Sequence, residues 1–138
     1  MASATPCACT ALKKASRAIS RRYDDALAGT GLGIAQFAIL RSIARNGDMP
    51  LSRLAEAMVM DRTSLYRALG PLARQGWIAI ASGAGRSKSA SLTPEGIAAM
   101  EAATGPWEAA QSRFVADLGA DRWTALQSLL GDVLDAAR

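Results

Sequence analysis

The chain has 138 residues, a formal net charge of +4 and 50% hydrophobic residues. This length fits one domain with or without a dimerisation extension, and the hydrophobic share is too high for a disordered chain. Its three Trp, two Tyr and two Phe are few beside the many Ala and Leu, which favours helices over sheet. There is no apolar run of roughly 20 residues and no signal-peptide pattern, so we expect a cytoplasmic protein.

The charge is unevenly distributed along the sequence. Residues 1–50 have seven Lys/Arg against three Asp/Glu, residues 51–90 have six against two, and residues 91–138 have three against seven. A basic surface confined to one part of a protein is typical of nucleic-acid binders, although many other soluble proteins also have a basic half.

The first half of the chain predicts two helices. One extends from Thr10, as its N-cap, to about Ala28, and it has one apolar and one basic face. The next extends from about Ile34 to Asn46. The positions of this helix that we expect to face inward are Phe37, Leu40, Ile43 and Ala44. A turn then leads to Met49-Pro50, which we expect to form a brief strand.

Two closely spaced helices follow the predicted strand. The first begins near Ser52. The second begins with Asp61 as its N-cap and buries Leu65, Leu69 and Leu72, which lie on one helical face. Pro71 predicts a kink or the loss of the last turn, and Gly76 predicts the helix end.

The rest of the chain predicts a β-hairpin and two more helices. Strands at 77–81 and 90–92 flank a Gly/Ser-rich loop. Thr93 is the expected N-cap of a long helix with Pro94 in its first position, and a final helix begins near Gly119. The fold class is therefore mainly α with a small β-hairpin wing: a winged helix-turn-helix at 34–93 within a single domain of 1–138.

A winged helix-turn-helix inserts its second helix into a DNA major groove, so we expect double-stranded DNA as a partner. The expected DNA contacts are Arg62, Thr63, Ser64, Tyr66 and Arg67 on that helix, Ser52 and Arg53 on the preceding helix, and Arg86 and Lys88 on the wing. An ordinary solvated surface is the alternative for each of them, and for Arg53 it is equally plausible.

Four segments, in this order along the chain, resemble the MarR family of bacterial transcriptional regulators. They are Leu51-Ser52-Arg53-Leu54-Ala55-Glu56, Met60-Asp61-Arg62-Thr63-Ser64-Leu65, Leu72-Ala73-Arg74-Gln75-Gly76-Trp77-Ile78 and Leu92-Thr93-Pro94-Glu95-Gly96. The resemblance covers about Thr10 to Leu134. It implies a homodimer held by helices at 10–30 and 95–138, a pseudo-palindromic operator, and repression relieved by a small aromatic or phenolic acid. The wing departs from the family pattern because residues 82–88 contain no Asp to brace a wing arginine.

The effector site and the cysteines leave alternatives open. The residues that could line an effector pocket, or could simply belong to the core or a solvated face, are Arg17, Arg21, Tyr23, Phe37 and Trp107. Cys7 and Cys9 are too close for an easy mutual disulfide, so each could bridge to a second subunit on oxidation or be inert. The chain has no His, which argues against a metal site, and we expect no cofactor.

Three classes of function can be compared. A DNA-binding regulator, as repressor or activator, is favoured by the motifs. An enzyme is disfavoured, since the sequence has no nucleophile elbow, no phosphate loop and no metal-ligand spacing. A structural winged-helix module that does not read sequence would differ from a regulator in its ratio of specific to non-specific DNA binding.

Overall fold

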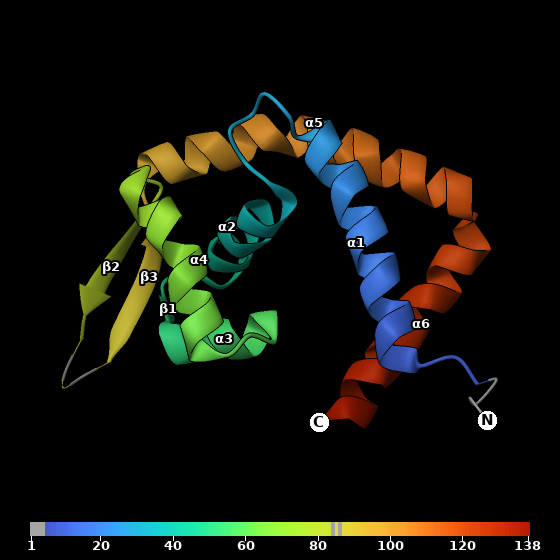
Figure 1. Cartoon of the computed structure of the whole chain (residues 1–138). Helices are drawn as coiled ribbons and strands as arrows, with labels where there is room; N and C mark the ends of the chain where they lie inside the picture. The colour runs from blue at the N-terminus through green and yellow to red at the C-terminus, as the bar shows by residue number, and fades with distance from the viewer. Residues whose placement is uncertain (1–4, 84, 86) are drawn as a thin grey trace.

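The computed structural model describes residues 5–83, 85 and 87–138, and they form an arch (Figure 1). The long helix α5 forms its top. One side carries a lobe of three helices and a small sheet, and the other carries α1 and α6. The elements are α1 (Ala8–Ala26), α2 (Ile34–Asn46), β1 (Met49–Pro50), α3 (Leu51–Met58), α4 (Arg62–Arg74), β2 (Ile78–Ser82), β3 (Lys88–Leu92), α5 (Pro94–Leu118) and α6 (Ala120–Ala137). The predicted fold class, a mainly helical winged helix-turn-helix, is confirmed.

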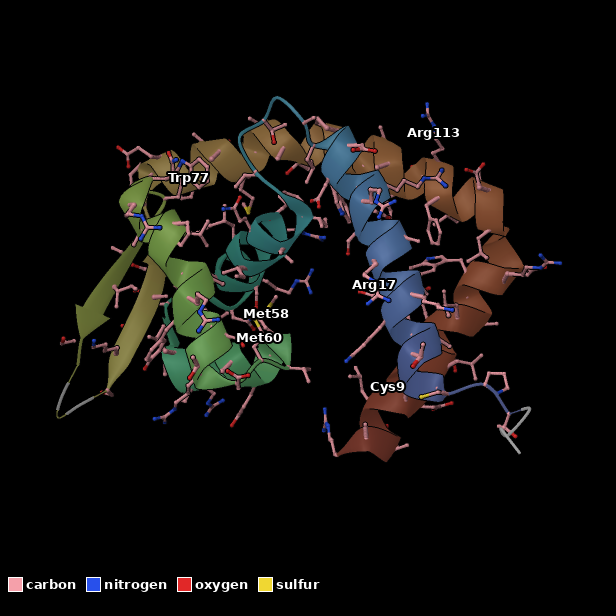
Figure 2. The ribbon with its side chains drawn as sticks, in the orientation of Figure 1. Cys9, Arg17, Met58, Met60, Trp77 and Arg113 are labelled. Carbon is pink, nitrogen blue, oxygen red and sulfur yellow. The ribbon has the colours of Figure 1, made fainter. Side chains whose placement is uncertain are left out.

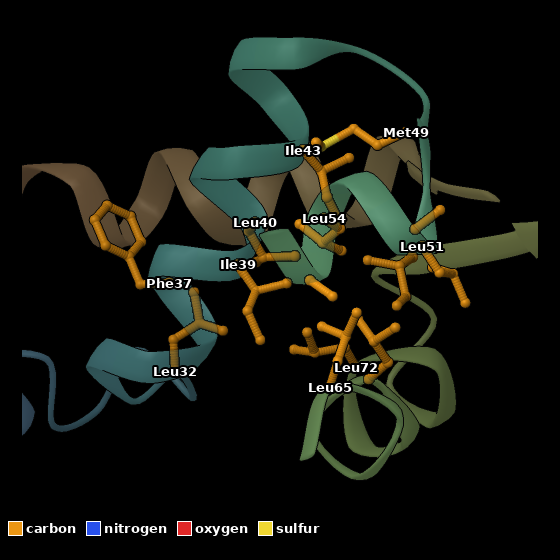
Figure 3. Close-up of a cluster of buried hydrophobic side chains, with 14 of the residues drawn as sticks. Leu32, Phe37, Ile39, Leu40, Ile43, Met49, Leu51, Leu54, Leu65 and Leu72 are labelled. Carbon is orange, nitrogen blue, oxygen red and sulfur yellow. The ribbon is translucent and has the colours of Figure 1, made fainter. Parts of the chain in front are cut away.

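The hydrophobic core lies inside the lobe (Figure 3). Leu54, Leu65 and Leu72 are fully buried, and they bring α3 and α4 against α2. On α2 the prediction of Ala44 as an inward residue is wrong: Ala44 is exposed, and Ile39 is buried instead. Phe37, Leu40 and Ile43 face inward as expected, and Ile39 widens that face beyond a narrow stripe.

Helix α1 begins earlier than expected. Its N-cap is Cys7, so Thr10, predicted as the cap, lies inside the first turn. The residues before Thr10 are small, and nothing in them stops the helix from extending backwards by one turn. At its other end α1 is tied to α2, because the Asp24 carboxylate accepts a hydrogen bond from the Ile34 N–H at 2.7 Å. A negative charge there also complements the positive end of the α2 dipole.

Helix α4 is capped at both ends. Asp61 is its N-cap, as predicted. At the other end the Gly76 N–H donates to the Ala73 carbonyl and the Trp77 N–H to the Leu72 carbonyl, both at 3.0 Å, in a Schellman arrangement. The helix continues through Pro71 to Arg74, so the predicted loss of the last turn is wrong. These two hydrogen bonds and the burial of Leu72 stabilise the last turn, although Pro71 has no N–H to donate to the helix.

The sheet has the order β1-β3-β2 and is antiparallel throughout. The expected brief strand at Met49-Pro50 pairs with β3, with Met49 opposite Ala90. In the hairpin, Ile78 lies opposite Leu92 and Ser82 opposite Lys88. The wing therefore projects from the lobe next to the start of α3, which places all three strands beside the helix-turn-helix.

The base of the wing is bonded to the start of α5. Thr93, the predicted N-cap, accepts from the Gly96 N–H at 3.0 Å and donates its hydroxyl to the Gly76 carbonyl at 2.6 Å. The Thr93 N–H donates to the Trp77 carbonyl at 3.1 Å. Three hydrogen bonds therefore fix the first turn of α5 and the segment that joins α4 to the wing.

Helix α6 buries none of its own residues within the single chain. Leu129 is 59% exposed, and Leu130, Val133 and Leu134 are also exposed. No helix in the described part of the chain combines the length and the apolarity that crossing a bilayer requires.

The turn between α3 and α4 contains a strained residue. Val59 has φ 52° and ψ 47°, in the left-handed region, and is 70% exposed. A β-branched side chain is disfavoured there, while Asn tolerates this conformation. We expect Val59→Asn to raise the free energy of unfolding by about 1 kcal/mol. Chemical denaturation would measure the gain, and an unchanged or lower stability would mean that the Val59 side chain makes a compensating contact.

Candidate nucleic-acid interface

Helix α4 presents a polar face opposite its buried leucines. Asp61 starts the helix so that Leu65, Leu69 and Leu72 point into the lobe, and the opposite side of the helix points outward. Arg62, Thr63, Ser64, Tyr66 and Arg67 are all exposed, and Tyr66 is 48% exposed. The structure thus places all five predicted contact residues of this helix on the surface of its N-terminal half.

Part of this face lines a hollow shared with α3 and the wing. Its volume is about 290 Å³, and Ser52 from α3, Arg62 and Tyr66 from α4 and Lys88 from β3 lie around it. Four of the predicted DNA-contact residues, from three different elements, are therefore brought together. Arg53, Thr63, Ser64 and Arg67 are exposed but do not line it.

This hollow has the chemistry of an anion site. Two cationic residues, three hydroxyl-bearing residues (Ser52, Tyr66 and Ser87) and the first turn of α3 surround it. Pro50 is the N-cap of α3 and offers no side-chain cap, so the N–H groups of the first turn are not satisfied by a capping side chain. A DNA phosphate suits such surroundings.

Ser64 stabilises the N-cap of α4, a role that the sequence did not reveal. The Asp61 carboxylate accepts from the Ser64 N–H at 2.7 Å and from the Ser64 hydroxyl at 3.0 Å. These hydrogen bonds hold the pKa of Asp61 below its ordinary value of 3.8, so the cap is charged at neutral pH. A serine hydroxyl has one proton, so Ser64 would have to release Asp61 before donating to a phosphate.

The wing residues are only partly described. Lys88 is the first residue of β3, is exposed and faces the hollow. Arg86, the other predicted wing contact, lies outside the described residues.

The residues expected to line an effector pocket occupy separate places. Phe37 and Trp107 meet, with ring centroids 5.8 Å apart, but Phe37 is fully buried. Tyr23 is buried and donates its hydroxyl to the Gln111 side chain. Arg21 lines a different cavity between α1 and α5, and Arg17 is exposed on α1 (Figure 2).

Arg41 lies beside Phe37 and Trp107, although the sequence alone did not point to it. Its guanidinium carbon lies 4.1 Å from the centroid of the Trp107 ring and 5.7 Å from that of Phe37. Arg41 is one helical turn after Phe37, and this spacing is the signal in the sequence that could have pointed to it. Together with Arg45, Met100 and Thr104 it lines a shallow cavity of about 280 Å³ between α2 and α5.

The cysteines lie at the start of α1. Cys7 and Cys9 are free and exposed. Hydrogen bonding by the Thr10 hydroxyl lowers the pKa of the Cys7 thiol, and backbone hydrogen bonds of Thr10 and Cys9 add to this effect. Within residues 5–83, 85 and 87–138, no three His, Cys, Asp or Glu side chains lie close enough together to hold a metal ion.

Comparisons with known proteins give consistent results. A model of the MarR family matches residues 32–79. The Mycobacterium tuberculosis transcriptional regulator MosR, solved in complex with DNA, is 32% identical, with a TM-score of 0.84 over 96% of this chain and 99% of that one. No curated protein sequence matches the chain.

More distant structures share the fold. A mutant of Escherichia coli MarR, solved with operator DNA, is 23% identical, with a TM-score of 0.81 over 91% of each chain. The PcaV regulator of Streptomyces coelicolor, solved with its natural ligand, is 20% identical, with a TM-score of 0.87 over all of both chains. The identity to MosR over nearly the full length of both chains, together with the family match across the helix-turn-helix, shows that this chain belongs to the MarR family of transcriptional regulators.

Proposed function

We propose that this regulator is a homodimeric, sequence-specific DNA-binding repressor that a small aromatic or phenolic acid releases from its operator. The observation that carries the DNA-binding part is the hollow where Ser52, Arg62, Tyr66 and Lys88 meet beside the exposed face of α4. In this proposal α4 reads base edges in the major groove, while the hollow holds the backbone. The DNA complex of MosR supports DNA as the partner.

The side chains of α4 have different roles in recognising bases. Arg62 and Arg67 can each donate two hydrogen bonds to a guanine, and Thr63 can contact a thymine methyl group. Arg53 contacts the backbone from α3, and Arg86 with Lys88 contacts it from the wing. Because residues 82–88 contain no acidic residue, the wing lacks a carboxylate brace, and α4 carries more of the specificity than the wing.

The helices outside the lobe support the proposed homodimer. An α6 with no buried residue leaves a large apolar surface that a second copy would cover. Two recognition helices related by two-fold symmetry would then reach a pseudo-palindromic operator with half-sites about 34 Å apart.

The test is a comparison of DNA affinities by fluorescence anisotropy. A duplex from the promoter region next to its own gene should bind at least about 1,000-fold tighter than an unrelated duplex at the same salt concentration. Raising the salt should weaken both. Equal affinity for the two duplexes would indicate a structural winged-helix module instead.

We propose that the effector binds at Arg41 and Trp107, beside the buried Phe37. An arginine held over an aromatic ring is suited to a ligand with both a carboxylate and a ring, because it can exchange the ring for a charge-assisted hydrogen bond. Two proteins of the same fold are linked to ligands: 6-hydroxynicotinic acid regulates DNA binding by Bordetella bronchiseptica BpsR, and PcaV was solved with its natural ligand.

We therefore expect a binding aromatic acid to raise the melting temperature of the wild type and to weaken its DNA binding. Arg41→Gln should reduce ligand affinity by about tenfold or more, since it removes a charged hydrogen-bond donor. A thermal-shift panel of hydroxybenzoic and hydroxynicotinic acids would measure this. Arg122→Gln, which makes the same change at an exposed arginine of α6 outside this cavity, is the control, and equal loss in both variants would contradict the assignment.

A redox-responsive regulator is the second candidate, and the lowered pKa of Cys7 favours it. Thiolates are the form that oxidants attack, so peroxide would oxidise the exposed Cys7, which would then form a disulfide with a cysteine of the second copy while the peroxide is reduced to water. Peroxide should then weaken DNA binding and give a dimer band on a non-reducing gel, and Cys7→Ser should abolish both effects. An oxidised wild type that keeps its DNA affinity would exclude this mode of control.

A further inference from the structure

One side of α1 carries an uninterrupted band of positive charge. Lys13, Lys14, Arg17 and Arg21 follow the spacing i, i+1, i+4 and i+8, which places them within about 100° of one another around the helix axis. All four are exposed, and no Asp or Glu occurs from Ala8 to Arg22. Like charges four positions apart destabilise an isolated helix, and Arg17 has one on each side. We call these four residues the basic stripe.

The basic stripe is free of contacts that would neutralise it. The opposite side of α1 is the one that packs within the chain: Leu12 and Ile19 line a cavity with α5 and α6, and Arg22 forms a salt bridge with Asp117. The side chains of the basic stripe form no ion pair among the described residues. Their repulsion is therefore not offset within the described chain, and the stripe suits an anionic partner.

The position of α1 indicates which anion could reach the stripe. Figure 1 shows the N-terminal end of α1 at the open side of the arch, where α3 and the first turns of α4 also lie. The exposed half of α4 is the surface proposed to read bases. Helix α1 lies outside the lobe with α6, whose exposed apolar residues support the proposed homodimer. In a two-fold dimer joined there, the α1 helices of both copies would lie between the two lobes, above the DNA that joins the half-sites.

We propose that the basic stripe binds the phosphate backbone of the operator between its two half-sites. The inference rests on the proposed homodimeric DNA binding and adds a contact from outside the winged helix. Duplex DNA carries one negative charge per roughly 1.7 Å of its axis, so a row of cations along a helix has phosphates to meet. Contacts to phosphates carry no sequence information. The stripe therefore adds affinity for any duplex that spans the dimer and leaves the choice between sequences to α4.

The salt dependence of DNA binding tests the contact. Arg17→Gln with Arg21→Gln removes two charges from each copy, so the plot of log affinity against log NaCl concentration should become less steep by about 2 to 4. At about 100 mM NaCl, affinity should fall at least about tenfold for the promoter duplex and for an unrelated duplex of equal length. The matched control is Arg74→Gln with Arg122→Gln, which removes the same charge from exposed arginines of α4 and α6 and should leave the slope unchanged.

A second measurement keeps the wild-type protein and changes the DNA, so it needs no variant to fold. A footprint first maps the protected stretch of the promoter, and the phosphates at its centre are then replaced by uncharged methylphosphonates. The wild type should bind this duplex at least about tenfold more weakly than the unmodified one, whereas Arg17→Gln with Arg21→Gln should bind the two within about threefold of each other. The same number of methylphosphonates outside the footprint should change neither affinity.

The outcomes separate the basic stripe from the proposed function. If the wild type binds the duplex with the neutral centre as tightly as the unmodified one, or if the control loses as much slope as the arginine variant, the stripe contact is overturned while DNA binding stands. A loss of affinity that only follows a loss of dimer, measured by sedimentation equilibrium of the same variant, also overturns the contact. A wild type that binds no duplex overturns both.

Discussion

Replacing Arg62 and Arg67 together with alanine is expected to reduce affinity for the operator by roughly 100-fold or more, because each arginine can contribute about 1–3 kcal/mol of base discrimination. Both lie on the exposed N-terminal half of α4, and neither helps to fill the core. The loss should therefore appear in DNA binding and not in thermal stability. Fluorescence anisotropy on the promoter duplex and a thermal melt of the same sample measure the two effects.

The control for this prediction is Arg74→Ala. Arg74 is an exposed residue in the last turn of the same helix, twelve positions after Arg62 and so about 18 Å away along the axis. Arg74→Ala removes one positive charge from this helix, as Arg62→Ala and Arg67→Ala each do, but outside the half that is proposed to face DNA. An equal loss of specific affinity in all three single variants would mean that net charge binds the DNA and that α4 does not read bases from its first turns.

The two arginines should also affect specificity and salt dependence differently from the residues of the hollow. Ser52 and Lys88 surround a hollow that suits a phosphate, so their removal should weaken specific and non-specific duplexes alike. Loss of a base-reading arginine should instead reduce the ratio between the affinity for the promoter duplex and the affinity for the unrelated duplex.

Most of the secondary structure could be predicted from the sequence because it depends on local signals. The bounds of α2 agree with the prediction at both ends, and Asp61 and Thr93 cap the helices that they were expected to cap. A capping side chain acts on N–H groups two or three residues away, so the pattern lies within one turn. The start of α1 was predicted wrongly because its true N-cap, Cys7, is not a typical capping residue.

The candidate site was predictable only in part. Periodicity identifies the exposed face of α4, since the buried leucines leave the remaining positions outward. It cannot show that Ser52, Arg62, Tyr66 and Lys88 surround one hollow, because that depends on how the wing packs beside α3. The stacking of Arg41 on Trp107 joins residues 66 positions apart, so the sequence could show only the one-turn spacing between Phe37 and Arg41.

Gly96 is another position where the structure supplies a reason that the sequence does not. A Cβ atom at this residue would lie 1.9 Å from the backbone oxygen of Trp77 and 2.8 Å from its carbonyl carbon. The Trp77 carbonyl is itself held by the Thr93 N–H, and the neighbouring Gly76 carbonyl by the Thr93 hydroxyl. The close approach joins the base of the wing to α5, and only glycine leaves enough room for it.

We therefore expect Gly96→Ala to lower the free energy of unfolding by about 3 kcal/mol, because overpacking against fixed backbone cannot be relieved by a side-chain rotation. The matched control is Gly131→Ala inside α6, where a Cβ would meet nothing within 4 Å. That change should raise stability by up to about 1 kcal/mol through the better helix propensity of alanine. Chemical denaturation of both variants measures the difference, and a Gly96→Ala protein as stable as the Gly131→Ala protein would show that the wing and α5 can separate at this junction without loss.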